Sequence, residues 1–204
     1  MKLFSSMGPN PKMVRIFIAE KGMEIERVDV DIRGGENRKE PYLSAVNPTG
    51  GVPALELDDG RIISEITAIC EYLDEIGTGP SLIGDTPAER AETRMWTRRV
   101  DLGICEPMTN GFRFSQGLEM FRDRFLCMPQ AADDLKATAA RNLAWLDGQM
   151  AGKTWLCGDR FSMADIMLYA FVGFFAKLGQ KPDESLANVN AWMARMAERP
   201  SAKA

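Results

Sequence analysis

Histidine is absent from all 204 residues of the chain. This absence excludes Ser-His-Asp and Cys-His catalysis, zinc sites of the HExxH type and proton transfer through an imidazole. The cysteines are widely spaced and form no CxxC pair, which argues against a thioredoxin-type redox motif and a zinc ribbon. They are Cys70, Cys105, Cys127 and Cys157. The sequence therefore predicts reduced, mostly buried thiols and no metal site.

Two further features are missing, an excess of basic residues and a long apolar run. The formal net charge is −4, so the chain offers no basic face for nucleic acid. The longest nearly apolar run, residues 166–176, is too short to span a bilayer, and the N-terminus lacks the apolar core of a signal peptide. We therefore expect a cytoplasmic protein that binds neither nucleic acid nor membranes.

What is present is an ordinary globular composition, with 45% hydrophobic and 26% charged residues. The length suits one large domain or two small ones. The first part alternates between strand and helix patterns: a strand over residues 2–5, a helix capped by Asn10 with Pro11 at its first position, and a strand over residues 25–32. A short helix is expected near Tyr42. The helical connection predicts that the two strands pair in parallel.

Residues 50–76 form the most informative stretch. Two glycines and Val52-Pro53 lead into a short strand, and Asp59-Gly60 is typical of a two-residue hairpin turn. A returning strand follows, and Ser64 is a candidate N-cap for a helix with Glu65 in its first turn. The apolar face of that helix is expected at Ile66, Ile69, Leu73 and Ile76.

After residue 87 the pattern is helical. We expect one or two long helices over residues 88–114, and then a helix with one apolar face. That face comprises Leu135, Ala139, Leu143, Leu146 and Met150. Ser162 and Asp165 form a capping-box variant before an apolar run, and we interpret the pair as structural. A last helix carries Trp192 and Met196.

The order of loop, proline, hairpin and capped helix resembles the glutathione-binding half of the glutathione transferase superfamily. The resemblance is carried by Val52-Pro53-Ala54-Leu55, by Ser64-Glu65-Ile66-Thr67-Ala68-Ile69 and by the Ser162-x-x-Asp165 box. It covers nearly the whole chain and is strongest over residues 47–76 and 155–170. It implies an α/β thioredoxin-like N-terminal domain over residues 1–78, a linker over 79–87 and an all-α C-terminal domain over 88–204.

The resemblance implies glutathione as co-substrate and assigns residues to it. In the superfamily the peptide bond before the proline is cis. The backbone of the residue before the proline, here Val52 before Pro53, pairs with the cysteinyl unit of glutathione as the edge of a strand would. The resemblance implies that the Glu65 carboxylate binds the ammonium of the γ-glutamyl group of glutathione. The backbone N–H groups of Glu65 and Ile66 are implied to bind the carboxylate of the same γ-glutamyl group. Most members carry Ser or Thr where this chain has Ile66, but the atypical fungal and bacterial transferases do not. Lys39 is placed like the residue that meets the glycyl carboxylate, and is equally typical of a solvated loop charge.

A transferase must also ionise the glutathione thiol. A free thiol has a pKa of about 8.5, so a shift of roughly two units, worth about 2.7 kcal/mol, is needed at pH 7. The superfamily commonly uses Tyr, Ser or Cys after the first strand, and no tyrosine is present there. The candidates are the Asn10 amide, the hydroxyls of Ser5 and Ser6, and the N-terminus of the first helix. Asn10 is also typical of a simple N-cap, and such serines are often ordinary strand-end residues.

The electrophile is expected between the loop after the first strand and the first long helix. The candidate residues are Met7, Gly8, Met108, Phe112 and Phe114. Two functions stay open. The first is a glutathione transferase that conjugates the glutathione thiolate to small hydrophobic electrophiles, a detoxification activity, as a homodimer like its relatives. The alternative is a glutathione-fold binding or regulatory protein with little or no turnover.

Overall fold

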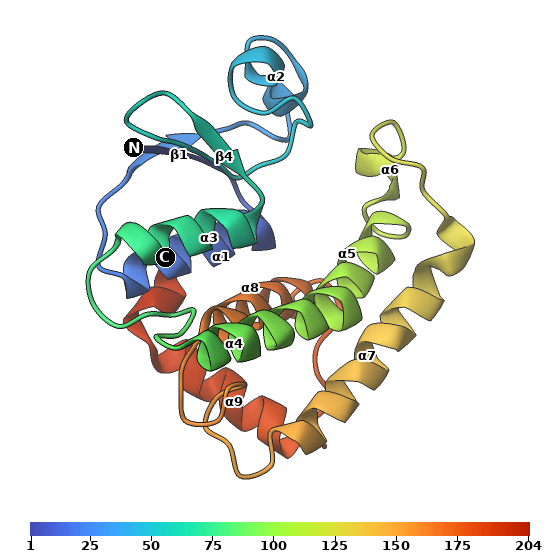
Figure 1. The fold of residues 1–204 in the computed structure, drawn as a ribbon. Coiled ribbons are helices and arrows are strands. Elements are labelled where there is room, and N and C mark those ends of the chain that lie inside the picture. Colours follow the sequence, from blue (N-terminus) through green and yellow to red (C-terminus); the bar gives the residue numbers. More distant parts are fainter. The chain divides into compact units, whose positions relative to one another are not determined.

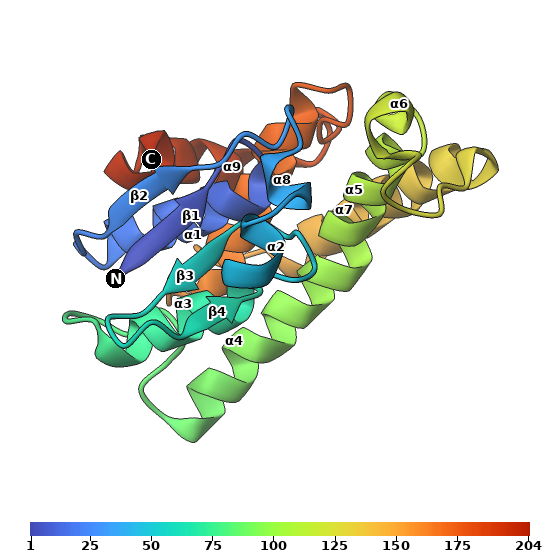
Figure 2. The same ribbon diagram turned by 90° about the horizontal axis from the view of Figure 1, so that it is seen from above.

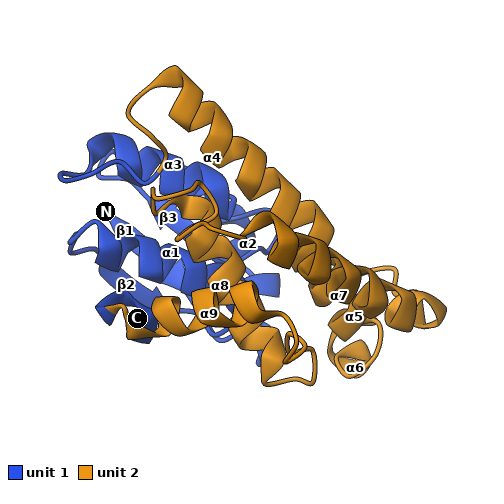
Figure 3. Ribbon diagram, turned by 90° about the horizontal axis from the view of Figure 1, so that it is seen from below, with its two compact units in different colours: residues 1–82, 200–204 blue, residues 83–199 orange.

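The computed structural model describes residues 1–204 and contains two compact units (Figures 1 and 3). Unit 1 comprises Met1–Leu82 and Pro200–Ala204, and unit 2 comprises Ile83–Arg199. Unit 1 contains the whole sheet, whereas unit 2 has helices and two isolated bridges but no strand. The predicted fold class, an α/β N-terminal domain followed by a helical one, is therefore confirmed.

The sheet of unit 1 has four strands in the order β2-β1-β3-β4. They are β1 (Lys2–Ser5), β2 (Glu26–Asp29), β3 (Ala54–Glu56) and β4 (Ile62–Ser64). β1 and β2 pair in parallel, as predicted, although β2 is shorter than the expected 25–32. β1 and β3 pair antiparallel, as do β3 and β4.

Helices cover both faces of this sheet. α1 (Pro9–Glu20) and α3 (Ile66–Ile76) lie side by side on one face, and α2 (Tyr42–Ala45) lies on the other (Figures 1 and 2). The alternation of β1 explains the two layers, since Leu3 is buried toward α1 and α3 while Phe4 meets Tyr42 of α2 edge to face at 6.1 Å. Of the predicted apolar face of α3, Ile69 and Leu73 are buried, whereas Ile76 is exposed.

Both helices of that layer begin differently from the sequence prediction. α1 starts at Pro9 with Gly8 as its N-cap, so Asn10 is its second residue and not its cap. Gly8 has φ 128°, a conformation that glycine adopts without strain, and Pro9 then supplies a preset helical φ. The N-cap of α3 is Glu65, because Ser64 is the last paired residue of β4.

The hairpin turn is also longer than predicted. Leu57 donates to the carbonyl of Arg61 at 2.8 Å, which leaves the three residues between them as the loop. The last of these, Gly60, has φ 84°. A three-residue turn with glycine in the left-handed region is the common alternative to the two-residue turn that Asp59-Gly60 suggests.

Unit 2 contains six α-helices, α4 to α9. They are α4 (Pro87–Val100), α5 (Glu106–Arg113), α6 (Leu118–Phe121), α7 (Ala132–Gln149), α8 (Met163–Ala176) and α9 (Ala187–Glu198). A π-helical turn, Asp101–Cys105, joins α4 to α5, so the expected helical stretch over 88–114 is interrupted at its centre.

Pro107 accounts for this interruption. Proline has no N–H, so Pro107 cannot bond to the carbonyl four residues earlier, that of Gly103. The Asn142 side chain of α7 donates to this carbonyl instead, at 2.7 Å. The bulge therefore has an identifiable cause, and a residue of a neighbouring helix satisfies the backbone group that the proline leaves unpaired.

The core of unit 2 is organised around the start of α8. The carboxylate of Asp165 is fully buried and accepts the N–H groups of Leu156 at 3.0 Å and Ser162 at 3.1 Å, and the indole N–H of Trp192 at 2.9 Å. Burial raises the pKa of Asp165 to about 6 in spite of these hydrogen bonds. The capping box is present, and its acid holds α8, α9 and the preceding loop together. Its predicted structural role is confirmed.

We expect Asp165→Ala to lower the free energy of unfolding by about 3 kcal/mol or more, because three buried donors lose their acceptor and each costs about 1–3 kcal/mol. Urea denaturation measures the change. The matched control is Glu89→Ala at the capping box of α4, whose hydrogen bonds lie at the surface, so that water replaces the carboxylate. Equal, small shifts for the two variants would contradict this account.

Candidate functional site

Strand register brings three chain segments to one end of the sheet in unit 1. Phe4 pairs with Ala54, and Ala54 pairs with Ser64. The residues just beyond these pairs therefore share that end: Ser5 as the last residue of β1, Ser6 after it, Pro53 before β3 and Glu65 after β4. α1 and α3 also begin there, and the first turn of a helix presents unpaired N–H groups that attract anions.

Glu65 has an unusual backbone at this end. It is the one non-glycine residue with a positive φ, at 70°, and its side chain is exposed and makes no capping hydrogen bond. Such a conformation costs of order 1–3 kcal/mol and persists only where the surrounding structure imposes it. Here β4 on one side and α3 on the other fix the residue, since its carbonyl accepts the N–H of Ile69 at 2.9 Å. A charged carboxylate is thus held in place without an internal partner.

The segment before β3 is held by side chains from the preceding loop and α2. The amide of Asn37 donates to the carbonyl of Gly50 at 2.6 Å. The Tyr42 hydroxyl and the Asn47 amide both donate to the carbonyl of Gly51, at 2.8 and 3.1 Å. Burial, with the Glu36 carboxylate as a smaller cause, raises the pKa of Tyr42 to about 12, so the hydroxyl stays a donor at neutral pH. The backbone that leads into Val52 is therefore fixed by these hydrogen bonds.

The Val52–Pro53 peptide bond is cis, as the resemblance implies. Three side chains that the sequence does not predict hold the glycines before it: Asn37, Tyr42 and Asn47. The spacing of Asn37 and Asn47 in polar loops gave no signal for them. Tyr42 was expected only as part of a short helix. A second cis bond, Glu40–Pro41, was not expected either.

Ser5 and Ser6 are both buried, with 0% and 8% of their surface exposed. The Ser5 side chain is fully buried, and its hydroxyl accepts a hydrogen bond from the Arg15 guanidinium at 3.1 Å. The same guanidinium donates to the carbonyl of Ser6 at 3.0 Å. Arg15, from the second turn of α1, therefore ties the end of β1 to the helix that follows, and Ser5 has no open path to a ligand.

The start of α1 has few backbone donors. Pro9 and Pro11 carry no N–H, and the N–H of Lys12 already bonds to the carbonyl of Gly8 at 3.2 Å. Asn10, between the prolines, is the one residue of the first three with a backbone N–H. It is half-buried, and its side-chain amide makes no hydrogen bond within the chain. The free hydrogen-bond donors at the start of this helix are therefore those of Asn10.

Lys39 and Ile66 lie beside these elements. Lys39 is exposed and follows the 3-10 helix Glu36–Arg38, and its ammonium donates to the carbonyl of Gly34 at 3.1 Å. Ile66 is the first residue of α3 and is half-buried. Its side chain offers no hydrogen-bonding group, so polar contacts at this position must come from the backbone.

The residues predicted for the electrophile divide between the two units. In unit 1, Met7 is 58% exposed and Gly8 caps α1. In unit 2, Met108 and Phe114 are buried, and the ring of Phe112 lies against those of Phe121 and Phe175 at 6.3 and 6.0 Å. The electrophile site stays a prediction.

The structure shows neither a cluster of metal ligands nor a helix that could span a membrane. No group of three or more cysteine, aspartate or glutamate side chains is arranged to hold a metal ion. None of the helices has the length and apolar character needed to cross a bilayer.

Comparison with known proteins identifies the family. Residues 7–76 match the family model for the glutathione S-transferase N-terminal domain, and residues 124–200 match that for the C-terminal domain. Glutathione S-transferase 2 of Saccharomyces cerevisiae is 35% identical over 203 residues, covering 96% of this chain and 84% of the yeast protein. Glutathione S-transferase GstA of Escherichia coli O157:H7 is 30% identical, covering 98% and 94%.

A solved structure agrees with these sequence matches. The crystal structure of a glutathione S-transferase domain-containing protein from Marinobacter aquaeolei VT8 has a TM-score of 0.93 and 38% identity, covering 99% of this chain and all of that one. Both halves of the chain thus match the same family in sequence, and its full length matches in structure. The chain belongs to the glutathione S-transferase superfamily.

Proposed function

We propose that the protein is an active glutathione transferase, which conjugates the glutathione thiolate to small hydrophobic electrophiles. The observation that supports this best is Glu65, an exposed carboxylate without an internal partner, held at φ 70° where α3 begins. A strained backbone of this kind at a helix start indicates a functional position. The acid suits the ammonium of a γ-glutamyl group.

Glutathione then binds along the sheet end. The backbone of Val52 pairs with the cysteinyl unit as an added strand would, next to the cis Pro53. The N–H groups at Glu65 and Ile66 receive the γ-glutamyl carboxylate, where the α3 dipole favours negative charge. Lys39 meets the glycyl carboxylate. The hydroxyl that Ile66 lacks would supply about 1.5–3 kcal/mol in a charge-assisted hydrogen bond, so the backbone donors carry more of the binding here.

The thiol is activated by donors at the start of α1. Asn10 supplies a backbone N–H and a free side-chain amide, and both stabilise the thiolate more than the thiol. Ser6 is a weaker candidate, and Ser5 is weaker again because its hydroxyl is buried against Arg15. The thiol proton passes to water. The thiolate sulfur forms a bond to the electrophilic carbon, and the leaving group departs with its electron pair.

The electrophile is proposed to lie against an apolar surface. The residues proposed for it are those predicted from the sequence: Met7, Gly8, Met108, Phe112 and Phe114. Methionine has three rotatable bonds and a polarizable sulfur, so Met7 adapts to electrophiles of different shape. This flexibility fits a detoxification activity with a broad range of substrates.

Two observations favour a second function, a glutathione-binding or regulatory protein with little turnover. Ile66 cannot donate a side-chain hydrogen bond to glutathione, and no tyrosine or cysteine follows β1. A conjugation assay separates the two functions, because the second function predicts that the protein binds glutathione without turnover.

We also propose a cytoplasmic homodimer, with residues 1–78 as the glutathione-binding domain, 79–87 as a linker and 88–204 as the helical domain. Unit 2 exposes large apolar side chains on α4, the π turn and α7. They are Met95 (40% exposed), Leu102 (50%) and Trp145 (47%). Large exposed apolar side chains are candidates for a surface that a protein partner covers.

We expect Glu65→Ala and Glu65→Gly both to lose detectable glutathione binding, because each removes the carboxylate. Glu65→Gly should be the more stable of the two by about 1 kcal/mol, since glycine adopts φ 70° without a steric penalty. Calorimetric titration and urea denaturation measure the two effects. An alanine variant that binds within twofold of the parent would remove Glu65 from the site.

We expect Asn10→Ala to lower kcat/KM for glutathione conjugation to 1-chloro-2,4-dinitrobenzene by more than tenfold, or about 1.4 kcal/mol, and to raise the apparent pKa of the thiol. Ser5→Ala and Ser6→Ala should each change it by less. A hundredfold loss with a raised pKa at either serine would instead identify that serine as the activating group. Glutathione binding without turnover in the parent, across several electrophiles, would establish the second function.

We expect Trp145→Glu to convert the dimer into a monomer, because a charge replaces an exposed apolar ring. Size-exclusion chromatography with light scattering measures the mass. The control is Met120→Glu, an exposed methionine of α6 that lies outside this group. A parent protein that is monomeric at micromolar concentration would refute the proposal, and so would a dimeric Trp145→Glu variant.

A further inference from the structure

Three of the residues proposed for the electrophile belong to α5: Met108, Phe112 and, at the C-cap, Phe114. The direction of α5 is set by the π turn before it, in which the N–H of Glu106 bonds to the carbonyl of Asp101, five residues earlier. One extra residue in a turn rotates everything after it by roughly 100° about the helix axis. Without that rotation Met108, which is 1% exposed, would leave the buried face. The π turn therefore decides which side chains of α5 face the core.

Two carbonyl groups around Pro107 are satisfied by side chains, in different ways. The Thr109 hydroxyl donates to the carbonyl of Cys105 at 2.7 Å, from within the same helix. The Asn142 amide donates to the carbonyl of Gly103 at 2.7 Å, and comes from α7. The first contact moves with α5, whereas the second ties the turn to a neighbouring helix. Asn142 thereby fixes the π turn relative to α7.

The contact between Asn142 and Gly103 is close and well supported. α7 runs beside the π turn and α5 (Figure 1). Leu143 and Leu146 of α7 are 3% and 0% exposed, so this part of the helix is anchored in the core. A Cβ atom on Gly103 would lie 3.3 Å from Nδ2 of Asn142, so the glycine lets the amide approach the backbone. The donor therefore has a fixed origin and a fixed target.

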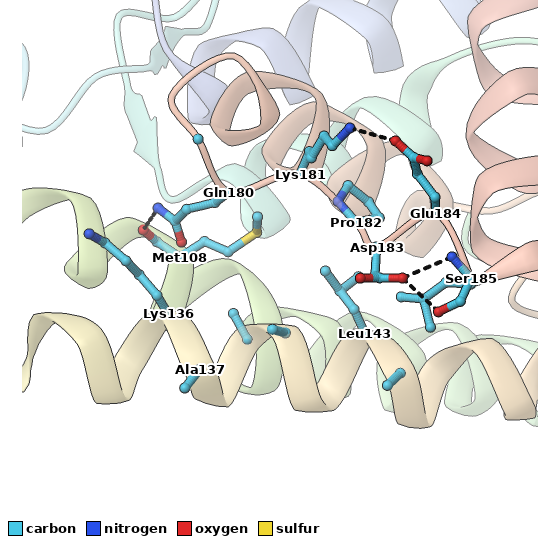
Figure 4. Close-up of a pocket in the computed structure, with 15 residues that line it drawn as sticks. Met108, Lys136, Ala137, Leu143, Gln180, Lys181, Pro182, Asp183, Glu184 and Ser185 are labelled. Carbon is cyan, nitrogen blue, oxygen red and sulfur yellow. Dashed lines mark hydrogen bonds and ion pairs between the residues drawn. The ribbon is translucent and has the colours of Figure 1, made fainter.

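Other contacts hold α5 further along. The Gln180 amide donates to the carbonyl of Met108 at 2.9 Å (Figure 4). The ring of Phe112 lies against those of Phe121 and Phe175. These contacts hold the middle and the end of α5, and the hydrogen bond from α7 holds the turn from which it starts. A helix of eight residues held at both ends has little freedom to tilt.

Water can replace the Asn142 amide as a donor but not as a support. Gly103 and Asn142 both line a groove of about 330 Å³, and one water molecule takes up about 30 Å³ in the liquid. If the amide is removed, water can satisfy the Gly103 carbonyl, so we expect the fold to survive. Water does not link the turn to α7 along a fixed direction. Loss of the amide should therefore affect the placement of α5 more than the stability of the chain.

We propose that Asn142 is a positioning residue for the electrophile. By holding the Gly103 carbonyl it fixes the direction of α5, and with it the surface that Met108 and Phe112 offer to the apolar part of the substrate. The inference rests on the proposed function, because these are residues proposed for the electrophile. It adds an expectation of its own: loss of one amide on α7 weakens binding of the electrophile and leaves that of glutathione unchanged.

The test compares glutathione with S-hexylglutathione, whose hexyl chain takes the place of an electrophile on the sulfur. Asn142→Asp keeps the shape of the side chain and replaces the donor by an oxygen that the carbonyl repels. We expect calorimetric titration to show at least a fivefold loss of affinity for S-hexylglutathione and a change within twofold for glutathione. The KM values for 1-chloro-2,4-dinitrobenzene and glutathione should divide in the same way. Asn142→Ala, in which water reaches the carbonyl, should show the same split if Asn142→Asp does not fold.

Asn188→Ala is the matched control. The Asn188 amide donates to the carbonyl of Asp147 at 3.0 Å, so it also joins two helices of unit 2, α9 and α7. What it holds is α9 and not the π turn. We expect this variant to bind both compounds within twofold of the parent, even if urea denaturation shows that it is as destabilised as Asn142→Ala.

Pro107→Ala tests whether Asn142 acts through the Gly103 carbonyl. The alanine restores an N–H group that can bond to this carbonyl from within the helix. In this background Asn142→Ala should change the affinity for S-hexylglutathione by less than twofold, because the carbonyl no longer depends on the amide. An equal loss in both backgrounds would overturn the inference that Asn142 acts through this carbonyl.

Failure of this inference is distinguishable from failure of the proposed function. If the parent binds both compounds and Asn142→Asp keeps both affinities within twofold, the inference alone is overturned. Equal losses for the two compounds also overturn it, because they indicate a general loss of structure. A parent that binds neither compound overturns the proposed function and this inference with it. Binding without turnover does not affect the test, since titration needs no reaction.

Discussion

Two ladders of backbone hydrogen bonds, β1 to β3 and β3 to β4, determine where the candidate site forms. They place the end of β1, the start of β3 and the end of β4 at one edge, so segments 60 residues apart in the sequence meet there. Register is strongly specified because one face of β1 is buried under α1 and α3. A slip of one residue would expose Leu3 and bury Phe4 on the wrong face. The packing of the core therefore also fixes the geometry of the site.

That core also supports the strained residues at the site. Glu65 at φ 70° is unfavourable by itself, and the α3 side chains Ile69 and Leu73, with no exposed surface, hold the helix that imposes the conformation. On the other side of the sheet, Asn37 and Tyr42 hold the loop before Val52 by donating to backbone carbonyls. Rigid packing and polar loop anchors thus act on the same few residues, which is the usual way a scaffold positions a binding site.

The parts predicted from sequence are those with a local physical signature. The periodicity of α7 and the Ser162–Asp165 box identified their elements, because helix faces and caps depend on residues within one or two turns. The failures involve conformations or partners that spacing does not encode. Gly8 caps α1 because only glycine suits φ 128°, although Asn10 is the better cap by residue type. The π turn depends on Asn142, 39 residues from the carbonyl that it binds. The candidate glutathione residues came from resemblance to a family, and the side chains that hold their loop were found only in the structure.

The absence of histidine is compatible with the proposed chemistry. Ionising the glutathione thiol requires donors that stabilise the thiolate more than it requires a base that removes the proton. A thiol of pKa about 8.5 loses its proton to water readily once the thiolate is favoured by about two units. Fixed donors supply such a shift without a titrating side chain. In this chain the prolines at positions 9 and 11 remove two of the donors that a helix start usually offers, so Asn10 alone supplies a backbone N–H and an amide there. The proposed activation of the thiol therefore depends on Asn10 alone, a dependence that an imidazole or a tyrosine hydroxyl would make unnecessary.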